Sequence, residues 1–514
     1  MSQALIAALQ NPALYPHAVD GFQVIETHIS WVLLTGPYVY KMKKPVNFGF
    51  LDFSDLSARE HFCNEELRLN QRLTKDMYLE VIPITGTVDA PQLGGTGTPI
   101  EFVLRMRQFP QDNLLSTLQA KGELTSTHTD ALATQIAQFH LQAPRVPAEH
   151  PQGTPDSVMA PVLQNFEQIR PFLKDPADLL QVDALEAWAQ STFERLHPLF
   201  LARKAEGFIR ECHGDVHLGN ATVIDGQVVI FDCIEFNEPF RFTDVYADIG
   251  FLAMDLEDRG LKSLARRFLS QYLELTGDYR GLELLNFYKA YRALVRAKVA
   301  LFSMPQDADG VQRAAALRTY RNYANLAESY SAIPSRFLAI TSGVSAVGKS
   351  HVAMRLVEAL GAIRLRSDVE RKRLFADTAD AHQLYDADAS RKTYAHLETL
   401  AGIVLHAGLP VVIDATYLKR EQRAATSRIA EITGVPFLIL DCNAPAPVIA
   451  SWLAQRQAEQ TDPSDATLEV IETQQAEREM LSDEELLLSK RVETNESDSL
   501  DKLVHQIRQR LPGL

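Results

Sequence analysis

One loop in the second half of the sequence carries every fixed residue of the pattern G-x-x-x-x-G-K-[ST]. It consists of Gly343, Val344, Ser345, Ala346, Val347, Gly348, Lys349 and Ser350. In such a loop the backbone N–H groups face nucleotide phosphates, the lysine reaches the β- and γ-phosphates, and the serine hydroxyl binds Mg²⁺. An apolar run at 337–341 precedes the loop and a helical pattern at 350–360 follows it, as this chemistry requires. We therefore expect these eight residues to bind ATP, with Ser350 also binding the metal.

Charged side chains follow the next two predicted strands. Asp368 and Arg371 come directly after an apolar run at 362–365, and Asp414 ends the run at 411–413. The carboxyl ends of parallel strands share one edge of a sheet, so these residues should lie beside the phosphate loop. There Asp368 could accept the proton of an acceptor hydroxyl while Arg371 neutralises the phosphoryl group in transit. Asp414 could contact Mg²⁺ through water or bind the acceptor.

A candidate lid lies further along the chain. Arg456 is on a predicted helix that leads into the polar turn at 461–467. A helical arginine before a polar turn is typical of a mobile segment that closes over ATP. A solvent-exposed arginine would explain the pattern about equally well.

The first half contains a second group of chemically capable residues, within the segment 213–220 of sequence HGDVHLGN. Asp215 could orient and deprotonate an acceptor hydroxyl, and Asn220, five residues later, could bind Mg²⁺. Asp232 ends the apolar run that follows and could bridge the metal to the phosphates. We expect His213 to hydrogen-bond the loop rather than to act in catalysis, and we expect no zinc site.

The HGDVHLGN segment resembles the aminoglycoside phosphotransferase family, which shares the protein-kinase architecture. The resemblance implies a lysine on an N-lobe strand that pairs with a glutamate on a helix and binds the nucleotide phosphates. Lys41 and Glu66 fit these two roles, although Lys43 on the same strand face and the neighbouring Glu65 are alternatives. It also implies that Asp248 braces the catalytic loop. One departure is the lack of a glycine-rich loop in the first hairpin.

The second half, from about residue 337 to residue 514, resembles small P-loop kinases. Examples are gluconate kinase, the kinase half of polynucleotide kinase and the zeta-toxin sugar-nucleotide kinases. The resemblance rests on the phosphate loop, on Asp368 with Arg371, on the segment 414–416 with Arg423 downstream, and on Arg456 as the lid arginine. It implies phosphoryl transfer from ATP and leaves the acceptor open. The whole chain resembles bacterial fusions of an aminoglycoside phosphotransferase-like domain with a P-loop kinase.

The elements that must position these residues differ between the two halves. Strand patterns at 28–34 and 38–43 flank Thr35-Gly36-Pro37 as a hairpin, a helix is predicted at 56–73, and helical patterns dominate beyond residue 115. After 334 strands alternate with helices, which predicts a parallel sheet. We predict an α+β kinase-like domain at 1–333, with an N-lobe at about 20–108 and a helical C-lobe at about 112–330. An α/β P-loop domain at 334–514 follows it.

Composition limits the partners. The 514 residues include 51 Lys plus Arg and 66 Asp plus Glu, giving a net charge of −15. An acidic chain favours small-molecule hydroxyl acceptors, such as sugars or nucleotides, over nucleic acid. No apolar run is long enough to cross a membrane, the N-terminus lacks the features of a signal peptide, and the four cysteines are scattered. We expect a cytoplasmic protein.

These observations predict a bifunctional ATP-dependent phosphotransferase with two ATP·Mg²⁺ sites that act on hydroxyl groups. Two alternatives remain open. One half could be a nucleotide-binding pseudokinase that regulates the other. The C-terminal half could instead phosphorylate the 5′-hydroxyl ends of nucleic acid, because basic residues lie near the predicted sheet edge. These are Arg364, Arg366, Arg371, Lys372, Arg373, Lys419, Arg420 and Arg423.

Overall fold

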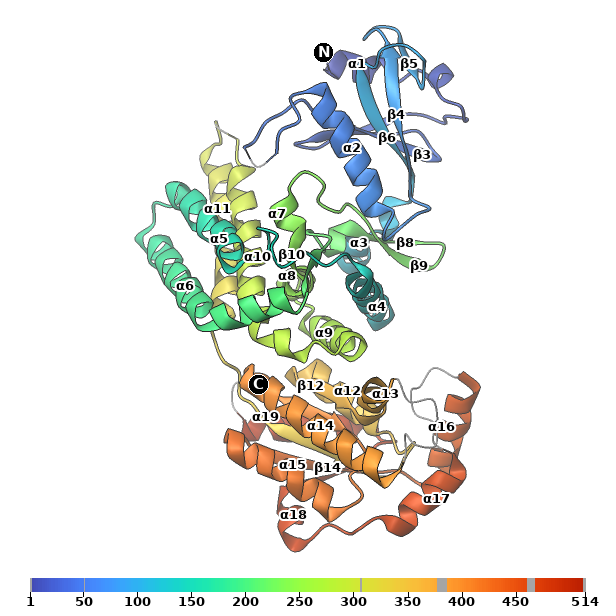
Figure 1. Ribbon diagram of the computed structural model, residues 1–514, viewed down its shortest axis with the longest axis vertical. Helices are drawn as coiled ribbons and strands as arrows, with labels where there is room; N and C mark the ends of the chain where they lie inside the picture. The colour runs from blue at the N-terminus through green and yellow to red at the C-terminus, as the bar shows by residue number, and fades with distance from the viewer. Residues whose placement is uncertain (1, 50, 306, 377–385, 460–466, 512–514) are drawn as a thin grey trace. The chain divides into compact units, whose positions relative to one another are not determined.

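The computed structural model describes residues 2–49, 51–305, 307–376, 386–459 and 467–511, and these form two compact units (Figure 1). The first unit comprises the chain up to Asp255, together with Leu301–Ser303. The second comprises Leu256–Ala300 and the chain from Met304 onward. None of the described helices is both long and apolar enough to span a bilayer.

A six-stranded sheet forms the N-terminal part of the first unit, with strand order β1-β2-β3-β6-β4-β5. The strands are β1 (Gln23–Glu26), β2 (Ser30–Leu34), β3 (Tyr38–Lys43), β4 (Tyr78–Gly86), β5 (Pro91–Leu93) and β6 (Glu101–Arg107). All neighbouring pairs are antiparallel, and the predicted hairpin of β2 and β3 is confirmed. The register places Lys41 opposite Val32 on β2 and Leu104 on β6, so Lys41 lies in the middle of the sheet.

Helix α2 (Leu56–Asn70) packs against β4 and β6 and crosses the sheet in Figure 1. It ends three residues before the predicted end at Leu73. Glu66 and Leu69 lie on its buried side, as the helical spacing predicted. The helix therefore presents a carboxylate to the strand that carries Lys41.

Helices dominate the rest of the first unit, as predicted. They are α1 (Ser2–Ala8, before the sheet), α3 (Leu115–Ala120), α4 (Ser126–Gln142), α5 (Pro155–Ile169), α6 (Pro176–Ala205), α7 (Glu238–Arg241) and α8 (Val245–Asp258), the last of which continues into the second unit. Two antiparallel strand pairs interrupt them: β7 (Ile209–Glu211) with β10 (Phe242–Asp244), and the hairpin of β8 (Ala221–Ile224) with β9 (Gln227–Ile230). The apolar run before Asp232 that the sequence showed corresponds to β9. Both pairs flank the segment 212–220, so they fix the ends of the predicted catalytic loop.

A five-stranded parallel sheet forms the centre of the second unit, with strand order β12-β13-β11-β14-β15. Its strands are β11 (Leu338–Ser342), β12 (Ile363–Arg366), β13 (Val411–Asp414), β14 (Phe437–Asn443) and β15 (Ser489–Glu493). All five residues of β11 are buried, as expected for a strand covered on both faces. The parallel sheet is thus confirmed, with β15 as an additional edge strand.

Helices cover both faces of this sheet. The helices of this part of the chain are α12 (Lys349–Leu360), α13 (Ser367–Leu374), α14 (Ala387–His406), α15 (Arg420–Thr433), α16 (Ala446–Glu459), α17 (Leu468–Glu477), α18 (Asp483–Leu488) and α19 (Ser497–Arg510), and α12, α14, α15 and α19 pack on its strands. Helix α12 packs with α19, and α14 packs with α15, as right-handed crossovers require for strands that run in both directions from β11. The carboxyl ends of β11, β12 and β13 therefore meet at one edge, which is where the phosphate loop begins.

Three further helices belong to the second unit. Two of them are α10 (Leu282–Phe302) and α11 (Gly310–Ser329), within the region beyond residue 115 where helical patterns were expected. Asp309 caps α11 by accepting a hydrogen bond from the backbone of Gln312, which starts a new helix after the break. Helix α9 (Lys262–Thr276) precedes them and packs on α12 and β12. It therefore reaches the strand that leads to Asp368.

Candidate active sites

The loop between β7 and β8 holds Asp215 and Asn220, two of the predicted residues of the first site. The side-chain amide of Asn220 donates to Asp215 Oδ2 and to the Asp215 carbonyl oxygen, each at 3.0 Å. Asp232 lies two residues after the end of β9 and adopts a left-handed φ of 66°. Its backbone N–H donates to the Tyr78 hydroxyl at 3.2 Å. A strained conformation held from the neighbouring sheet is typical of functional positions.

Asp248 on α8 braces this loop, as predicted. Its two carboxylate oxygens accept hydrogen bonds from the backbone N–H groups of His213, at 2.8 Å, and Gly214, at 2.9 Å. Gly214 has a φ of 88°, and a Cβ there would approach the Phe240 carbonyl oxygen to 3.0 Å, so a larger residue would disturb the loop. His213 Nδ1 accepts the Asp215 N–H, and its Nε2 lies 2.9 Å from the Phe231 carbonyl. Burial lowers the pKa of His213, so the neutral ring holds the loop.

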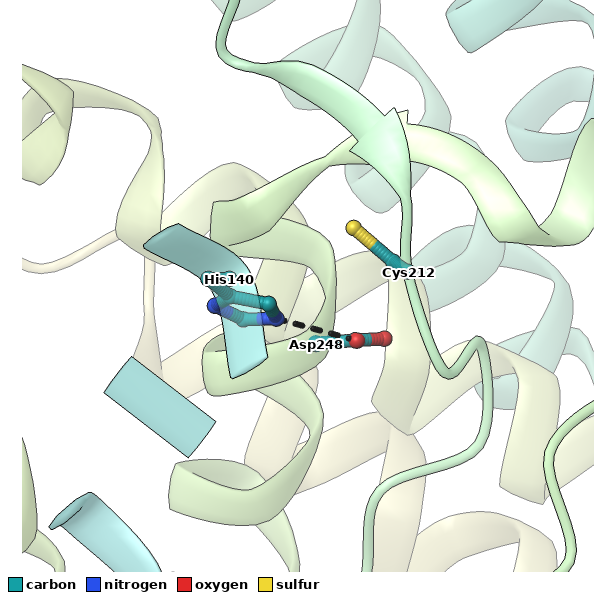
Figure 2. A group of neighbouring side chains, drawn as sticks. All are labelled: His140, Cys212 and Asp248. Carbon is teal, nitrogen blue, oxygen red and sulfur yellow. Dashed lines mark hydrogen bonds and ion pairs between the residues drawn. The ribbon is translucent and has the colours of Figure 1, made fainter. Parts of the chain in front are cut away.

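One group of potential metal ligands lies behind the same loop: His140 from α4, Cys212 and Asp248 (Figure 2). All three side chains are buried, and their ligand atoms lie within 4.8 Å of one another. The Asp248 carboxylate already accepts two backbone hydrogen bonds and lies 3.2 Å from His140 Nε2. Burial, followed by the charge of Asp248, raises the pKa of the Cys212 thiol. A protonated thiol is a poor ligand, so the group acts as an internal brace for the catalytic loop.

Glu66 on α2 bridges two lysines of β3. Lys41 Nζ lies 2.7 Å from Glu66 Oε1, and Lys43 Nζ lies 2.7 Å from Glu66 Oε2. Lys41 also contacts Asp232 Oδ1 at 2.9 Å, whereas Lys43 is fully buried and pairs with Glu235. The geometry thus separates the two lysines: Lys41 adjoins the candidate metal ligand, and Lys43 supports the helix from inside.

Electrostatics favours the ionised forms of these groups. Burial alone would raise the pKa of Glu66, but the charges of Lys41 and Lys43 lower it to about 2. Burial alone would lower the pKa of Lys41, but Asp232 and Glu66 raise it well above its ordinary value. Lys41 is therefore a permanent cation beside Asp232, as phosphate binding requires.

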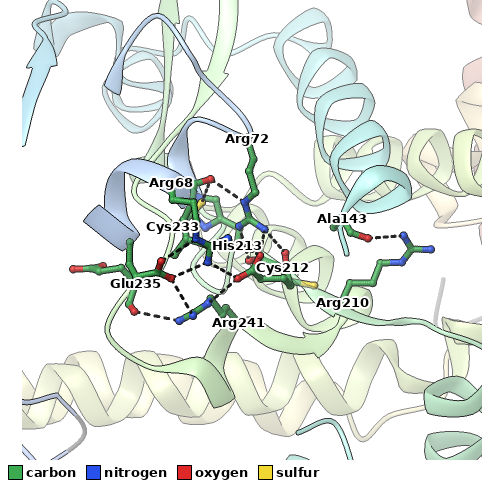
Figure 3. A network of polar contacts seen from close by, with 12 residues as sticks. Arg68, Arg72, Ala143, Arg210, Cys212, His213, Cys233, Glu235 and Arg241 are labelled. Carbon is green, nitrogen blue, oxygen red and sulfur yellow. Dashed lines mark hydrogen bonds and ion pairs between the residues drawn. The ribbon is translucent and has the colours of Figure 1, made fainter. Parts of the chain in front are cut away.

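A second ionic network ties helix α2 to the strand before the catalytic loop (Figure 3). Buried Glu211 on β7 accepts hydrogen bonds from Arg68 Nη2 at 2.7 Å and from Arg72 Nη1 at 3.0 Å. Arg241 Nε lies 3.3 Å from the same carboxylate, and Arg72 also donates to the Glu211 carbonyl oxygen at 2.8 Å. Glu65 pairs with Arg68 in this network, so Glu66 rather than Glu65 faces the lysines. The network fixes the helix that carries Glu66 relative to the loop that carries Asp215.

The first site has the donor types that suit Mg²⁺. The side-chain nitrogen of Asn220 donates a hydrogen bond to Asp215, so its amide oxygen is the atom that could bind a cation. Asp232 offers a carboxylate whose side chain is 41% exposed, beside the ammonium group of Lys41. Hard oxygen donors next to a fixed cation suit a magnesium-bound polyphosphate.

The phosphate loop of the second unit follows β11 and opens α12. Gly348 has a φ of 90°, and a Cβ there would lie 2.9 Å from the Cβ of Thr494. Thr494 follows β15 and donates to the Val347 carbonyl oxygen at 2.6 Å. Ala346 also has a left-handed φ, of 61°. This backbone shape turns successive N–H groups toward one centre, which forms a concave anion site.

Two side chains form hydrogen bonds with backbone groups of the phosphate loop. Lys349 Nζ donates to the Val344 carbonyl oxygen at 2.7 Å. Gln474 on α17 accepts the Ser345 N–H at 2.7 Å through its amide oxygen. An oxygen acceptor on a loop N–H has the chemistry of a phosphate oxygen, so the donor set of the loop fits a nucleotide phosphate.

The acidic residues of the second site lie at the predicted sheet edge. Burial, and then the charge of Asp414, raises the pKa of Asp368 above the ordinary carboxyl value. Asp414 Oδ2 is buried and accepts no hydrogen bond within the described part of the chain, and Arg366 Nε lies 3.7 Å away. Buried Arg371 donates to Ser390 Oγ at 3.5 Å. A carboxylate with a raised pKa beside a second carboxylate suits proton transfer, and the Asp414 oxygen suits a cation.

These groups line one cavity of about 1080 Å³. From the predicted set it includes Ser345, Ala346, Gly348, Lys349, Ser350, Asp368, Arg371 and Asp414. Gly343, Val344 and Val347 belong to the loop but do not line the cavity. Trp452, Thr494 and Asn495 are additional lining residues that the sequence did not single out. The volume can hold both a nucleotide and a small acceptor.

Two further arginines were singled out in the sequence: Arg456 in the predicted lid and Arg423 downstream of the segment 414–416. Arg456 belongs to helix α16, but its side chain and the turn at 461–466 lie outside the described residues. Arg423 is buried, pairs with Glu485 at 2.6 Å, and donates to the Tyr417 carbonyl oxygen at 3.1 Å. It stabilises the segment after β13 and does not line the cavity.

Comparison with known families divides the chain in the same order as the motifs. Residues 108–285 match the phosphotransferase enzyme family, and residues 338–481 match an AAA domain family. The first match includes Asp215, Asn220 and Asp232, and the second begins at β11 and includes the phosphate loop.

Similar proteins exist among curated sequences and solved structures. An uncharacterized protein of Mycobacterium tuberculosis is 29% identical over 459 residues, which covers 87% of this chain and 88% of the relative. A choline/ethanolamine kinase family protein from Mesorhizobium loti is 13% identical, with a TM-score of 0.40, over 64% of this chain and 97% of that one. A gluconokinase from Sinorhizobium meliloti is 19% identical, with a TM-score of 0.26, over 35% of this chain and 98% of that one.

The family matches, the antiparallel sheet with its lysine–glutamate pair, and the parallel sheet with its phosphate loop agree with one another. The chain thus joins a kinase-like segment that matches the phosphotransferase enzyme family to a P-loop segment that matches an AAA domain family, and both segments carry the motifs of kinases.

Proposed function

We propose that the protein is a bifunctional kinase that uses ATP and Mg²⁺ at two separate sites and phosphorylates hydroxyl groups of small molecules. In the first site Asp215 accepts the proton of the acceptor hydroxyl, and Lys41 binds the phosphates. Asn220 and Asp232 would hold the metal, which neutralises phosphate charge when bound. The proposed family segments are 1–333 and 334–514.

In the second site the backbone of the phosphate loop and Lys349 bind the phosphates. Ser350 and Asp414 would hold the metal there. Asp368 accepts the acceptor proton, and Arg371 stabilises the negative charge that develops on the phosphoryl group. Arg456 remains our candidate for a lid arginine.

The observation that carries the proposal is the presence of a carboxylate base candidate beside a phosphate-binding lysine in each unit. In the first unit Lys41 contacts Asp232 at 2.9 Å, and the neighbouring Phe231 donates its backbone N–H to the carbonyl oxygen of Asn220 in the loop that holds Asp215. In the second, Asp368 and Lys349 line one cavity. A pseudokinase would be expected to lack one of these groups, so the intact sets favour activity at both sites.

The basic edge of the second unit gives little support to a polynucleotide acceptor. Arg364 pairs with Glu274 at 2.6 Å, Arg423 pairs with Glu485, and Arg373 pairs with Glu370. Arginines that are neutralised inside the protein contribute little to binding a phosphate backbone. A small acceptor within the cavity is therefore favoured.

The test is a phosphoryl-transfer screen of a metabolite extract with the full chain and two variants. Asp215→Asn should abolish the products of the first site, and Lys349→Met should abolish those of the second. Each loss should amount to about 100-fold or more, which is the usual effect of removing a general base or a charge-stabilising group. If one variant lost no product, the corresponding half would be regulatory. Products on nucleic acid ends only would support the polynucleotide alternative.

A further inference from the structure

Two arginines of β12 share a carboxylate that comes from outside the P-loop family segment. Arg364 Nε lies 2.6 Å from Glu274 Oε1, and Arg366 Nη1 lies 3.9 Å from Glu274 Oε2. Glu274 belongs to α9, within the stretch that matches the phosphotransferase enzyme family. All three side chains belong to the second unit, and Glu274 and Arg364 are buried.

On their other sides the two arginines point to the phosphate site. Arg364 Nη1 donates to the Ser350 carbonyl oxygen at 3.4 Å, at the start of α12. Arg366 Nε lies 3.7 Å from Asp414 Oδ2, and Arg366 lines the cavity. Arg366 therefore stands between two carboxylates at nearly equal distances, one on α9 and one in the site.

Arg366 competes with a metal ion for Asp414. The strength of this competition depends on how the interaction of Arg366 is shared between Glu274 and Asp414. An arginine side chain cannot lose its proton, so it must be neutralised by whichever carboxylate is near. Glu274 supplies that charge from behind the strand. This leaves Asp414 Oδ2 without a hydrogen bond from any described residue, in a position where a cation could bind it.

A second contact from the same segment reaches the helix that carries Asp368. The Tyr279 hydroxyl donates to Glu370 Oε1 at 2.9 Å, and Glu370 is buried on α13. Arg373 of the same helix donates to both Glu370 and the Glu274 carbonyl oxygen. The segment 274–279 thus holds both the strand and the helix that flank Asp368.

We infer that Glu274 is a positioning residue for the P-loop site: by sharing Arg366 with Asp414 it weakens the pairing of Arg366 with Asp414, and so preserves the Asp414 carboxylate for the metal ion. This inference rests on the proposed phosphotransfer at that site. Glu274 does not line the cavity, so it acts through Arg366 and not on the substrate. A segment of the first family would in this way set the metal affinity of the second active site.

The test uses the full chain and follows binding rather than turnover. Trp452 lines the cavity, so a chain with Trp31→Phe and Trp188→Phe reports nucleotide binding at this site by Trp452 fluorescence. A nonhydrolysable ATP analogue is titrated with increasing Mg²⁺. In Glu274→Gln the Mg²⁺ concentration for half-maximal tight binding should rise about 10-fold, as is usual when a residue that supports a metal ligand is removed.

The matched control is Glu358→Gln, which removes another acidic partner from the same packing of α9 on α12. Glu358 pairs with Arg267 at 2.8 Å and is not among the residues that line the cavity. This variant should leave the Mg²⁺ dependence unchanged. An equal shift in both variants would mean that loosened packing is the cause and would overturn the inference.

A double variant separates the proposed route from a general loss of structure. If Arg366 is the competitor, Glu274→Gln should have no further effect on Mg²⁺ dependence once Arg366→Gln is present. Additive effects of the two substitutions would contradict the inference, as would an unchanged Mg²⁺ dependence in Glu274→Gln alone. If the wild-type chain bound no nucleotide at Trp452, the proposed function of this half would fail instead.

Discussion

Replacing Glu66 by glutamine tests the electrostatic core of the first unit. The substitution removes a negative charge that Lys41 and Lys43 share at 2.7 Å each, and it retains the shape of the side chain. Lys43 is fully buried and, among the residues that the structure describes, would keep Glu235 as its acidic partner. Breaking a buried ion pair on one side leaves an uncompensated charge in a medium of low dielectric constant.

The expected loss follows from the pKa of Glu66, which falls from its ordinary value of 4.5 to about 2 in the folded chain. A tenfold change in an acid dissociation constant corresponds to about 1.4 kcal/mol, so the ionised carboxylate stabilises the fold by about 3 kcal/mol. Because the pKa is lowered by folding, this stabilisation is complete above about pH 4.5 and is lost as the pH falls toward 2. The difference between wild type and variant should shrink over the same range.

Trp31 on β2 provides the measurement, because it is buried in this sheet. In a chain with Trp188→Phe and Trp452→Phe it is the remaining tryptophan, so its fluorescence follows unfolding of the N-terminal sheet alone. Urea titrations at pH 7, 5 and about 3.5 give the free energy of unfolding of this part for each variant.

The control is Glu65→Gln, one residue away, which removes a partly exposed partner of Arg68. This substitution should lower the free energy of unfolding by about 1 kcal/mol or less, as is usual for ion pairs near the surface. The reasoning would be refuted by a Glu66→Gln difference below about 1 kcal/mol at pH 7, or by one that does not change between pH 7 and 3.5.

Three further outcomes follow from contacts described above. Gln474→Ala removes the side chain that accepts the Ser345 N–H, so this N–H becomes available to a phosphate oxygen. Nucleotide binding measured by calorimetry should become about 2- to 10-fold tighter, which corresponds to one net hydrogen bond. Weaker binding would show that Gln474 contacts the nucleotide. Glu211→Gln leaves its arginine partners undercompensated and should lower the stability reported by Trp31 by about 2 kcal/mol, with no effect on Trp452. Because the pKa of Asp368 is raised, this carboxyl group loses its proton at a higher pH than an ordinary carboxyl. Turnover at the second site should therefore rise with pH above the ordinary carboxyl range, and this rise should vanish in Asp368→Asn.

The sequence predicted those parts of the sites in which chemistry is local. The phosphate loop and the HGDVHLGN segment were recognisable because their residues lie within eight positions of one another, and the structure brings Asp368 and Asp414 to the same edge as expected. The two lysines of β3 were also found, since both alternate onto one strand face. Their separate roles required the positions of Asp232 and Glu235, which are about 190 residues away in the chain.

The missed elements share two physical causes. Strand β15 is a polar edge strand with one fully buried residue, Val492, so it lacks the apolar run by which strands are recognised. His140, Glu274 and Gln474 act through contacts with residues 90 to 129 positions away in the chain, so no local sequence spacing reveals them. A buried charge on an amphipathic helix is indistinguishable from a solvated one until its partner is known.

Helix α9 also has a consequence for how the two family segments can be separated. A fusion joined only by a linker could be cut near Pro334 without harm to either product. Here such a cut would remove Glu274 and leave Arg364, with its guanidinium 2.6 Å from that carboxylate, as a buried cation without its counter-ion. The smallest self-sufficient P-loop enzyme would therefore begin before α9, so the seam visible in the sequence is not the place where the molecule can be divided.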